Sequence, residues 1–311
     1  MERMKMDDIL ITVITLAYHS LYLKETINSV LMQTYPRIQY LIIDDSSSDF
    51  FVKEIQEYIE NNKKGNIEEF FVCQNPINLG TVKSYNIALQ SAKGKYIFNL
   101  AGDDLFYDEF VLEEWVCEFL KRDSGIMTAY RAVYDNNMEQ YKGLFPTQEQ
   151  VAVILQNNPE HLFEELSKGN FIFGCCTARS SENIKKYGTC SEKYRLIDDY
   201  PVNLSLTRKG VMIDFWKRIA IKYRLGGISS PVNFNDIYEK DSDLIFKDEI
   251  IKYTKYPLKR WMEYHQWKYW HKGEGRITYY QNKYKDNKRR RLLIYIRYPI
   301  HALRAYKKKG K

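Results

Sequence analysis

Two pairs of adjacent acidic residues could carry chemistry in this sequence. The first is Asp103–Asp104, which follows an apolar segment and a single glycine, Gly102. Two carboxylates on a tight loop suit a hard divalent cation such as Mg²⁺ or Mn²⁺, which could in turn neutralise a diphosphate. Alternatively, one acid caps the following helix and the other is solvated. The pair alone does not decide between these two interpretations.

The second pair is Asp198–Asp199, which directly precedes Tyr200 and Pro201. Acids at this position could stabilise the N-terminus of a helix through its dipole. They could also supply a general base, because a carboxylate held near a second negative charge and a metal can deprotonate a hydroxyl nucleophile. Both interpretations stay open from the residues alone.

Three further polar residues are candidates for binding a ligand. Asp45 ends an apolar run and could accept a hydrogen bond from a base N–H or a ribose hydroxyl. It could equally form an Asx-turn into residues 46–48. Asn78 belongs to an Asn-Leu-Gly turn, and Lys83 could either meet a phosphate or remain an ordinary exposed lysine. None of these residues indicates a function by itself.

The first half of the chain alternates strand and helix patterns, and these elements must position the acidic residues. Apolar runs predict strands, and apolar residues at helical spacing predict helices. The strands are expected at 9–16, 38–43, 67–72, 96–100 and 125–134. The helices are expected at 21–32, at 49–60 with Asp49 as its cap, at 82–92 and at 108–121.

This alternation predicts βαβ units and a mainly parallel sheet that helices cover on both faces. Ligands of such sheets bind beyond the carboxyl ends of the strands. We therefore expect four polar clusters to converge on one edge, at 18–19, 44–45, 75–78 and 103–104. Beyond about residue 140 the pattern weakens, with helices expected at 151–155, 161–166 and 197–206 and strands at 170–176 and 210–215.

The charge of the chain is distributed unevenly. The net charge of +7 combines residues 1–250, with 28 basic and 37 acidic side chains, and residues 251–311, with 19 basic and 3 acidic ones. An acidic body of net charge −9 and a basic tail of +16 argue against a uniformly basic nucleic-acid binder. Peripheral association of 251–311 with an anionic membrane surface is expected from its basic and aromatic residues. A packed helical appendage and nucleic-acid contact remain as alternatives.

Targeting features are missing from the sequence as it stands. Residues 1–8 are charged and do not resemble a signal peptide, and no apolar stretch is long enough to span a membrane. The five cysteines are odd in number and contain no Cys-x-x-Cys pair. A cytoplasmic location is therefore expected, with peripheral binding to the inner face of the cell membrane.

Taken in order, these segments resemble the family 2 glycosyltransferases, which have the GT-A fold. Residues 13–19 (VITLAYH) look like that family's opening strand, and residues 41–49 (LIIDDSSSD) look like its V-V-D-D-G-S-x-D segment. Asn78, Asn86 and residues 94–97 are similar to an N-x-G…N…G-x-Y-I stretch, and Asp103–Asp104 stand where its DxD-type metal motif falls. The pair at 198–199 stands where an E-D pair precedes a helix. The resemblance covers about residues 8–230.

The resemblance implies a GT-A domain over 1–230, Rossmann-like, with a nucleotide-binding half at about 1–135 and an acceptor half at about 136–230. A basic, aromatic-rich helical extension would follow at 231–311. It implies inverting transfer from a nucleotide-sugar, a UDP-sugar being favoured, to a hydroxyl of a glycan or lipid-linked acceptor in bacterial surface polysaccharide synthesis.

The resemblance also implies roles for individual residues. The nucleotide-sugar would contact the residues Leu16, Ala17, Tyr18, Asp45, Asn78, Lys83 and Asp103. Mg²⁺ or Mn²⁺ would bridge the diphosphate to Asp103 and Asp104. Asp199, or Asp198 beside it, would accept the proton of the acceptor hydroxyl.

Several positions depart from the family pattern. Ala101 replaces the first acid of the usual D-x-D-D, so metal binding would depend on Asp103 and Asp104 alone. Leu16 and Ala17 replace a usual Pro-Thr, and Asp198 replaces the usual Glu. Residues 223–229 (YRLGGIS) resemble a Tyr-Arg-x-His-x-x-Ser segment without its histidine, which leaves a contact to the diphosphate unfilled.

The sequence supports other classes of function less well. A nucleotidyltransferase that makes an activated sugar usually carries a Gly-rich phosphate loop near its N-terminus, and residues 16–23 contain no glycine. A dinucleotide-dependent oxidoreductase is disfavoured for the same reason. A non-catalytic protein that binds lipid or nucleic acid through its basic tail is the remaining alternative.

Overall fold

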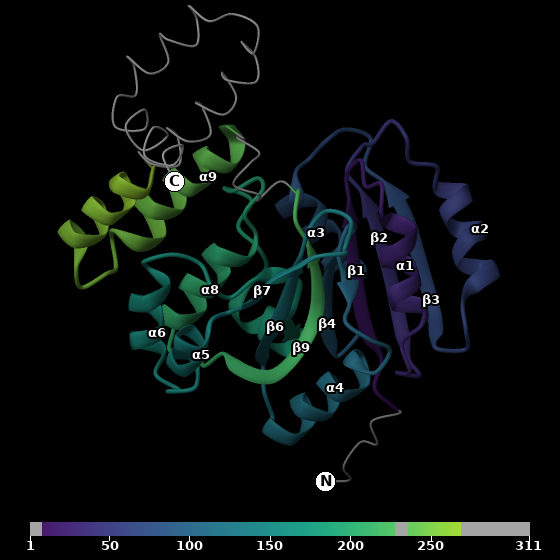
Figure 1. The fold of residues 1–311 in the computed structure, drawn as a ribbon, viewed down its shortest axis with the longest axis horizontal. Helices are drawn as coiled ribbons and strands as arrows, with labels where there is room; N and C mark the ends of the chain where they lie inside the picture. Colours follow the sequence, from purple (N-terminus) through teal and green to yellow (C-terminus); the bar gives the residue numbers. More distant parts are fainter. Residues whose placement is uncertain (1–7, 228–235, 269–311) are drawn as a thin grey trace, which may run out of the picture.

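The computed structural model describes residues 8–227 and 236–268. Within these residues, nine strands form a single mixed sheet in the order β3-β2-β1-β4-β8-β6-β9-β5, with β7 paired to β6. Helices lie on both sides of the sheet (Figure 1). This is the α/β architecture with a mainly parallel core that the sequence predicts.

The first four long strands pair with one another in parallel. They are β1 (Ile11–Ala17), β2 (Ile38–Asp44), β3 (Ile67–Gln74) and β4 (Tyr96–Ala101). Their connections are the helices α1 (Leu23–Leu31), α2 (Val52–Asn62) and α3 (Thr81–Ser91). Ala17 pairs with Asp44, Asp44 with Gln74, and Leu16 with Ala101. The loops after these four strands therefore start at the same edge, as expected.

The second half of the chain extends the sheet with strands of both directions. Its first elements are β5 (Leu105–Phe106), α4 (Val111–Arg122), β6 (Ile126–Tyr134), β7 (Tyr141–Phe145), α5 (Gln148–Ile154) and α6 (Pro159–Leu166). They are followed by η2 (Gly174–Cys176), β8 (Thr177–Ser180), α7 (Ser181–Tyr187), α8 (Asp199–Arg208) and β9 (Asp214–Arg224). Strand β8 runs antiparallel to both β4 and β6, whereas β9 runs parallel to β6.

Two local expectations are wrong. The strand expected at 170–176 is instead a loop that ends in the 3₁₀ turn η2, and the strand begins only at Thr177. Side chains satisfy the backbone of this loop, because Ile172 N donates to Asn170 Oδ1 and Gly174 N donates to Asp199 Oδ2. Likewise, Asp49 does not cap α2, which starts at Val52 without a side-chain cap.

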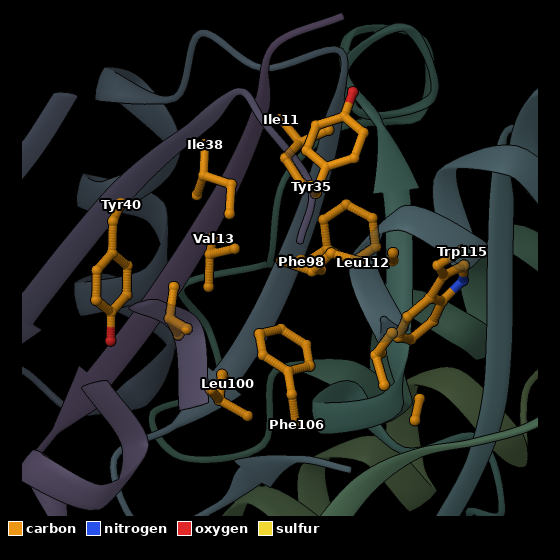
Figure 2. Close-up of a cluster of buried hydrophobic side chains, with 14 of the residues drawn as sticks. Ile11, Val13, Tyr35, Ile38, Tyr40, Phe98, Leu100, Phe106, Leu112 and Trp115 are labelled. Atoms are coloured by element: carbon orange, nitrogen blue, oxygen red, sulfur yellow. The ribbon is translucent and has the colours of Figure 1, made fainter. Parts of the chain in front are cut away.

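The core consists of two apolar layers, one on each face of the sheet. Strand β2 is buried at every position because helices cover both of its faces. Tyr40 and Ile42 point into one layer, while Leu41 and Ile43 point into the other. Figure 2 shows the first layer, in which the rings of Phe98 and Trp115 lie edge to face at 5.2 Å between centroids.

The C-terminal part of the described chain packs on the helices of the second half. It comprises α9 (Asp236–Ile245), the π-helical turn η3 (Phe246–Ile250) and helical residues 257–268. In Figure 1 these segments lie beside α8, at the opposite end of the molecule from α2 and β3. No helix within residues 8–227 and 236–268 is both long and apolar enough to cross a bilayer.

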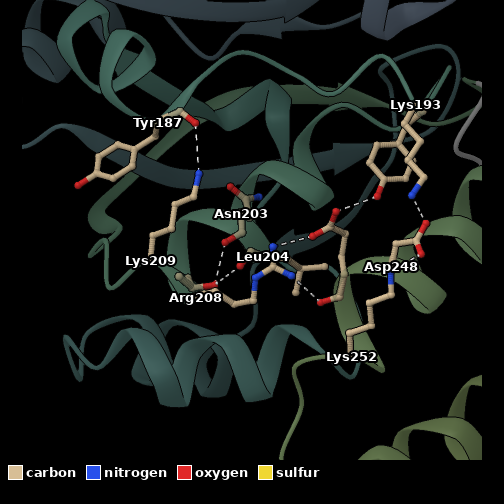
Figure 3. A network of polar contacts seen from close by, with 11 residues as sticks. Tyr187, Lys193, Asn203, Leu204, Arg208, Lys209, Asp248 and Lys252 are labelled. Carbon is tan, nitrogen blue, oxygen red and sulfur yellow. Dashed lines mark hydrogen bonds and ion pairs between the residues drawn. The ribbon is translucent and has the colours of Figure 1, made fainter.

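Polar contacts fix this C-terminal part in place. Figure 3 shows Arg208 at the end of α8, which forms an ion pair of 2.7 Å with Glu249. Asp248 pairs with Lys193 and, at 2.9 Å, with Lys252. The boundary expected at residue 230 and the basic clusters at 288–291 and 307–309 lie outside the described residues.

The approach of β4 to β1 gives a test of this packing. Gly94 N donates to Thr12 Oγ1 at 2.9 Å, and a Cβ at Gly94 would lie 2.3 Å from Thr12 N and 2.5 Å from the carbonyl carbon of Ile11. We expect Gly94→Ala to lower the free energy of unfolding by about 2–3 kcal/mol, because backbone must move. Urea unfolding measures this loss.

Gly65→Ala is the matched control, because a Cβ at Gly65 meets nothing within 4 Å. We expect its free energy of unfolding to change by no more than about 0.5 kcal/mol. Equal losses in the two variants would contradict the close approach of residue 94 to β1.

Candidate functional site

A cavity of about 1100 Å³ opens at the edge where the parallel strands end. Of the residues predicted from sequence, it is lined by Leu16, Tyr18, Asp103, Asp104, Asp198 and Asp199. The structure therefore brings together two acidic pairs that lie 95 positions apart in the chain. Ala17, Asp45, Asn78 and Lys83 do not line this cavity.

Asp103 and Asp104 form the loop between β4 and β5. Asp104 has no solvent exposure, and its Oδ1 accepts a hydrogen bond of 2.9 Å from Arg224 N. Its Oδ2 is buried and has no hydrogen-bond partner among the described residues. Burial is the main cause that raises the pKa of both carboxyls, that of Asp104 well above its usual range.

Arg224, at the end of β9, holds this loop in position. Its Nε donates to the backbone oxygen of Asp103 at 2.9 Å, and its Nη2 lies 2.6 Å from Glu25 of α1. The guanidinium also lies 3.6 Å from the ring centroid of Tyr22. Since Arg224 is only 2% exposed, these contacts form a buried anchor between the two halves of the sheet.

The residues of this loop fit a divalent cation that takes oxygen ligands. Two adjacent carboxylates are present, and one buried carboxylate oxygen has no other partner. No cluster of three or more His, Cys, Asp or Glu suited to a metal occurs within the described ranges. A cation here would therefore complete its coordination with oxygens of a diphosphate and water, as Mg²⁺ commonly does.

Asp198 and Asp199 lie at the start of α8 and also line the cavity. Asp199 Oδ2 accepts hydrogen bonds from Gly174 N at 2.8 Å and Asn170 Nδ2 at 3.1 Å, and its Oδ1 accepts one of 2.6 Å from Tyr200 N. The loop that replaces the expected strand at 170–176 thus orients this carboxylate. Asp198 forms no side-chain cap on α8.

The pair Asp198–Asp199 retains a proton more readily than ordinary aspartates do. Burial, followed by the adjacent charge of Asp199, raises the pKa of Asp198 to about 7. Burial also raises the pKa of Asp199, against the lowering effect of its hydrogen bonds to Gly174, Tyr200 and Asn170. A pair that changes its protonation near neutral pH is suited to general-base chemistry.

Asp45 is engaged in structural hydrogen bonds. Its carboxylate accepts hydrogen bonds of 2.8 Å from Leu79 N and Gly80 N and one of 2.9 Å from Asn75 Nδ2. The Asx-turn into the serines is made instead by Asp44, whose Oδ2 accepts from Ser47 N at 2.7 Å. Asp45 therefore shapes the turn that precedes α3.

Asn78 and Lys83 lie on either side of the start of α3. Asn78 Nδ2 donates to the backbone oxygen of Asp45 at 3.2 Å, and its Oδ1 accepts a hydrogen bond of 2.7 Å from Arg195 Nη2. Lys83 is exposed on α3. Ala17 is buried at the end of β1.

Arg131, which sequence reasoning missed, lies in the cavity wall. Its guanidinium carbon lies 3.4 Å from the ring centroid of Phe173 and 4.2 Å from that of Tyr223. Its Nη1 lies 3.9 Å from Cys175 Sγ, and its Nε is buried without a partner in the described part of the chain. A charged residue inside the otherwise apolar strand expected at 125–134 was the signal available in the sequence.

The helical residues 257–268 supply another part of the wall that was not predicted. The cavity is lined there by Arg260, Glu263, Tyr264 and Trp267. These four recur at a helical spacing, so they lie on one face. The described part of the C-terminal extension therefore contributes to the same cavity as the two acidic pairs.

Comparisons with known proteins agree with this architecture. A family model described as glycosyl transferase family 2 matches residues 12–188. TuaG of Bacillus subtilis, whose name assigns it to teichuronic acid biosynthesis, is 33% identical over 219 residues, covering 70% of this chain and 79% of TuaG. Several other curated glycosyltransferases match over less than half of their own length.

Two further comparisons concern a lipid-linked acceptor and the fold. WfaP of Escherichia coli is named a UDP-Glc:alpha-D-GlcNAc-diphosphoundecaprenol beta-1,3-glucosyltransferase and is 25% identical over 249 residues, 78% of this chain and 86% of WfaP. The crystal structure of S. aureus TarS 1–349 in complex with UDP-GlcNAc has a TM-score of 0.57 at 15% identity, covering 92% of this chain and 79% of that chain. That likeness concerns the fold alone, which is GT-A.

The family model spans more than half of the chain, and TuaG, at one-third identity, aligns with most of it. The order of the sequence motifs and the mixed sheet are those of the same family. The chain therefore belongs to the family 2 glycosyltransferases and is a glycosyltransferase.

Proposed function

We propose that this enzyme transfers a sugar, with inversion, from a nucleotide-sugar to a hydroxyl of a glycan or lipid-linked acceptor in bacterial surface polysaccharide synthesis. A UDP-sugar is the favoured donor. The observation that carries the proposal is the single cavity in which Asp103–Asp104 and Asp198–Asp199 meet. The names of TuaG and WfaP support this class of acceptor, and the name of WfaP supports the class of donor.

The donor lies, in this proposal, against the edge of the parallel strands. Leu16, near the end of β1, and Tyr18, just after it, provide the wall at this edge, and Ala17 supports it from the core. Asp45 and Asn78 act through the turn that they hold before α3. Lys83 is exposed in the first turn of α3 and does not line the cavity, so a role for it would require a phosphate that extends beyond the cavity lining.

Asp103 and Asp104 would hold Mg²⁺ or Mn²⁺ beside the diphosphate. When bound, such a cation supplies positive charge that stabilises the departing nucleoside diphosphate. The protein contributes a fixed loop, because Arg224 anchors both residues before any ligand arrives. A loop that is already ordered needs no reorganisation during the reaction.

Asp199 serves as the general base in this proposal. Three hydrogen bonds fix the orientation of its carboxylate, which faces the cavity at the start of α8. The acceptor oxygen forms a bond to the anomeric carbon while the bond to the diphosphate oxygen breaks, and the hydroxyl proton passes to Asp199. A single in-line displacement inverts the anomeric carbon without a covalent enzyme intermediate.

We assign Arg131 to the diphosphate of the leaving group. Two other arginines stack on tyrosine rings, and each has a carboxylate partner, Arg208 with Glu249 at 2.7 Å and Arg224 with Glu25 at 2.6 Å. Arg131 forms no ion pair with any residue in the described ranges. Its charge lowers the pKa of both Asp104 and Asp199, so it acts on a member of each acidic pair.

The first prediction concerns the donor. With Mn²⁺ present, we expect turnover of UDP-sugars, measured as release of UDP, and loss of that turnover with EDTA. Asp104→Ala should lower the rate by at least about 100-fold, because the leaving diphosphate loses its compensating charge. Glu57→Ala is the control, since that carboxylate is exposed on α2 and does not line the cavity. Turnover of GDP-sugars alone, or full activity of Asp104→Ala, would contradict the proposal.

The second prediction concerns pH. A base must be deprotonated to act, and burial raises the pKa of Asp199, so we expect kcat/KM to fall on the acid side of neutrality as the pair takes up protons, the pKa of Asp198 being raised to about 7. Asp199→Asn should lower kcat by about 10²–10⁴-fold. Asp198→Asn should remain active and move the acid limb to lower pH, because it removes the negative charge beside Asp199.

The opposite pattern would refute this assignment of the base. An inactive Asp198→Asn enzyme, together with an active Asp199→Asn enzyme, would show that Asp198 is the general base. A pH profile that is flat between about 5 and 8 in the wild-type enzyme would exclude the pair as the titrating group.

The third prediction concerns Arg131. We expect Arg131→Gln to weaken UDP binding at least tenfold in calorimetry, the loss that follows from one charge-assisted hydrogen bond of about 1.5–3 kcal/mol. Binding of uridine, which has no phosphate, should not change. Arg208→Gln is the matched control, because it removes a stacked arginine outside the cavity lining. Equal loss for UDP and uridine would show that Arg131 only supports the fold.

A further inference from the structure

The helical residues 257–268 have two faces in opposite environments. The inner face lines the cavity and consists of Arg260, Glu263, Tyr264 and Trp267, of which Arg260 is buried and Trp267, at the end of the helix, is 42% exposed. The outward face has the same helical spacing and consists of Leu258, Trp261, Met262 and His265. Leu258 is 72% exposed, Trp261 50% and Met262 59%. This one helix is thus both a wall of the cavity and an apolar surface.

Basic and aromatic side chains surround the outward face. Lys259 is exposed on its flank and forms no ion pair with any residue of the described ranges. Tyr253 and Tyr256, just before the helix, are each 54% exposed. Lys252 and Lys255 are also exposed, and each pairs with a surface carboxylate. Apolar and aromatic residues flanked by lysines are typical of helices that lie at a lipid headgroup boundary.

We propose that the outward face docks on an anionic lipid surface. The chain continues directly from Lys268 into residues 269–311, which contain 14 Lys and Arg but only 2 Asp and Glu. This charge complements anionic headgroups, which attract basic segments next to an apolar anchor. The outward apolar face and the basic segment therefore both fit an anionic lipid surface.

Charge also argues against a second copy of the chain as the occupant. In a symmetric dimer the same surface meets itself. Two outward faces in contact would bring Lys259 of both copies together, and each chain carries a further 14 Lys and Arg against 2 Asp and Glu at 269–311. Like charges across an interface oppose association, whereas an anionic lipid surface neutralises them.

Docking in this way places the cavity wall next to the lipid surface. The inner face of the same helix would then meet the head of a lipid-linked acceptor, and this one consequence rests on the proposed function. Lipid binding itself goes beyond the proposed reaction, because it requires no donor and no turnover.

Co-sedimentation of the full-length protein with vesicles tests the inference. We expect binding to vesicles of phosphatidylcholine with phosphatidylglycerol, and much weaker binding to vesicles of phosphatidylcholine alone. Combined replacement Leu258→Ser, Trp261→Ser and Met262→Ser should weaken binding to the anionic vesicles at least tenfold. The matched control is Phe71→Ser with Ile77→Ser, which removes side chains of 52% and 63% exposure elsewhere on the surface and should bind like the wild type.

Two results would overturn the inference. One is vesicle binding of the triple variant equal to that of the wild type. The other is a wild-type dimer that the triple variant converts to a monomer while vesicle binding is unchanged, which would assign the face to a second copy. The inactive Asp199→Asn variant should still bind anionic vesicles. Its vesicle binding therefore separates failure of the proposed reaction from failure of lipid docking.

Discussion

The confinement of four carboxylates to one cavity is the constraint on which the rest of this structure depends. Asp103, Asp104, Asp198 and Asp199 all line the cavity, and burial raises the pKa of each of them. Negative charges removed from water are unfavourable unless hydrogen bonds or opposite charges compensate them. The surrounding elements can be understood by how they provide that compensation.

Each acidic pair is compensated in a different way. Backbone amides and Asn170 stabilise Asp199, which keeps the carboxylate oriented and able to accept a proton. Arg224 secures the loop of Asp103 and Asp104 mainly through backbone atoms, so one oxygen of Asp104 stays available for a ligand. Arg131, stacked between Phe173 and Tyr223, adds positive charge in the cavity wall without using it on a protein carboxylate. Asp104 Oδ2 and Arg131 Nε, both buried without a partner among the described residues, are thus two groups that a metal–diphosphate ligand would satisfy.

Sequence reasoning was accurate where local pattern controls structure. Buried parallel strands read as continuous apolar runs, so β1 to β4 and their common edge were predicted within two residues at each end. The family assignment, which rests on the order of motifs along the chain, is confirmed. The loop at 170–176 was mispredicted because its apolar residues suggest a strand, while contacts with Asn170 and Asp199 decide its backbone. No role could be assigned to Arg131 from the sequence, because its position in the cavity wall depends on the rings of Phe173 and Tyr223, which lie far from it along the chain.

The helix at 257–268 joins two parts of the sequence that carry opposite net charge. The four acids of the cavity belong to residues 1–250, whose net charge is −9. On the inner face of the helix, Arg260 is engaged by Ser167 and Glu263, whereas Lys259 is exposed on its flank. The positive charge of Arg260 is therefore held by protein groups at the cavity wall, while that of Lys259 is turned to solvent.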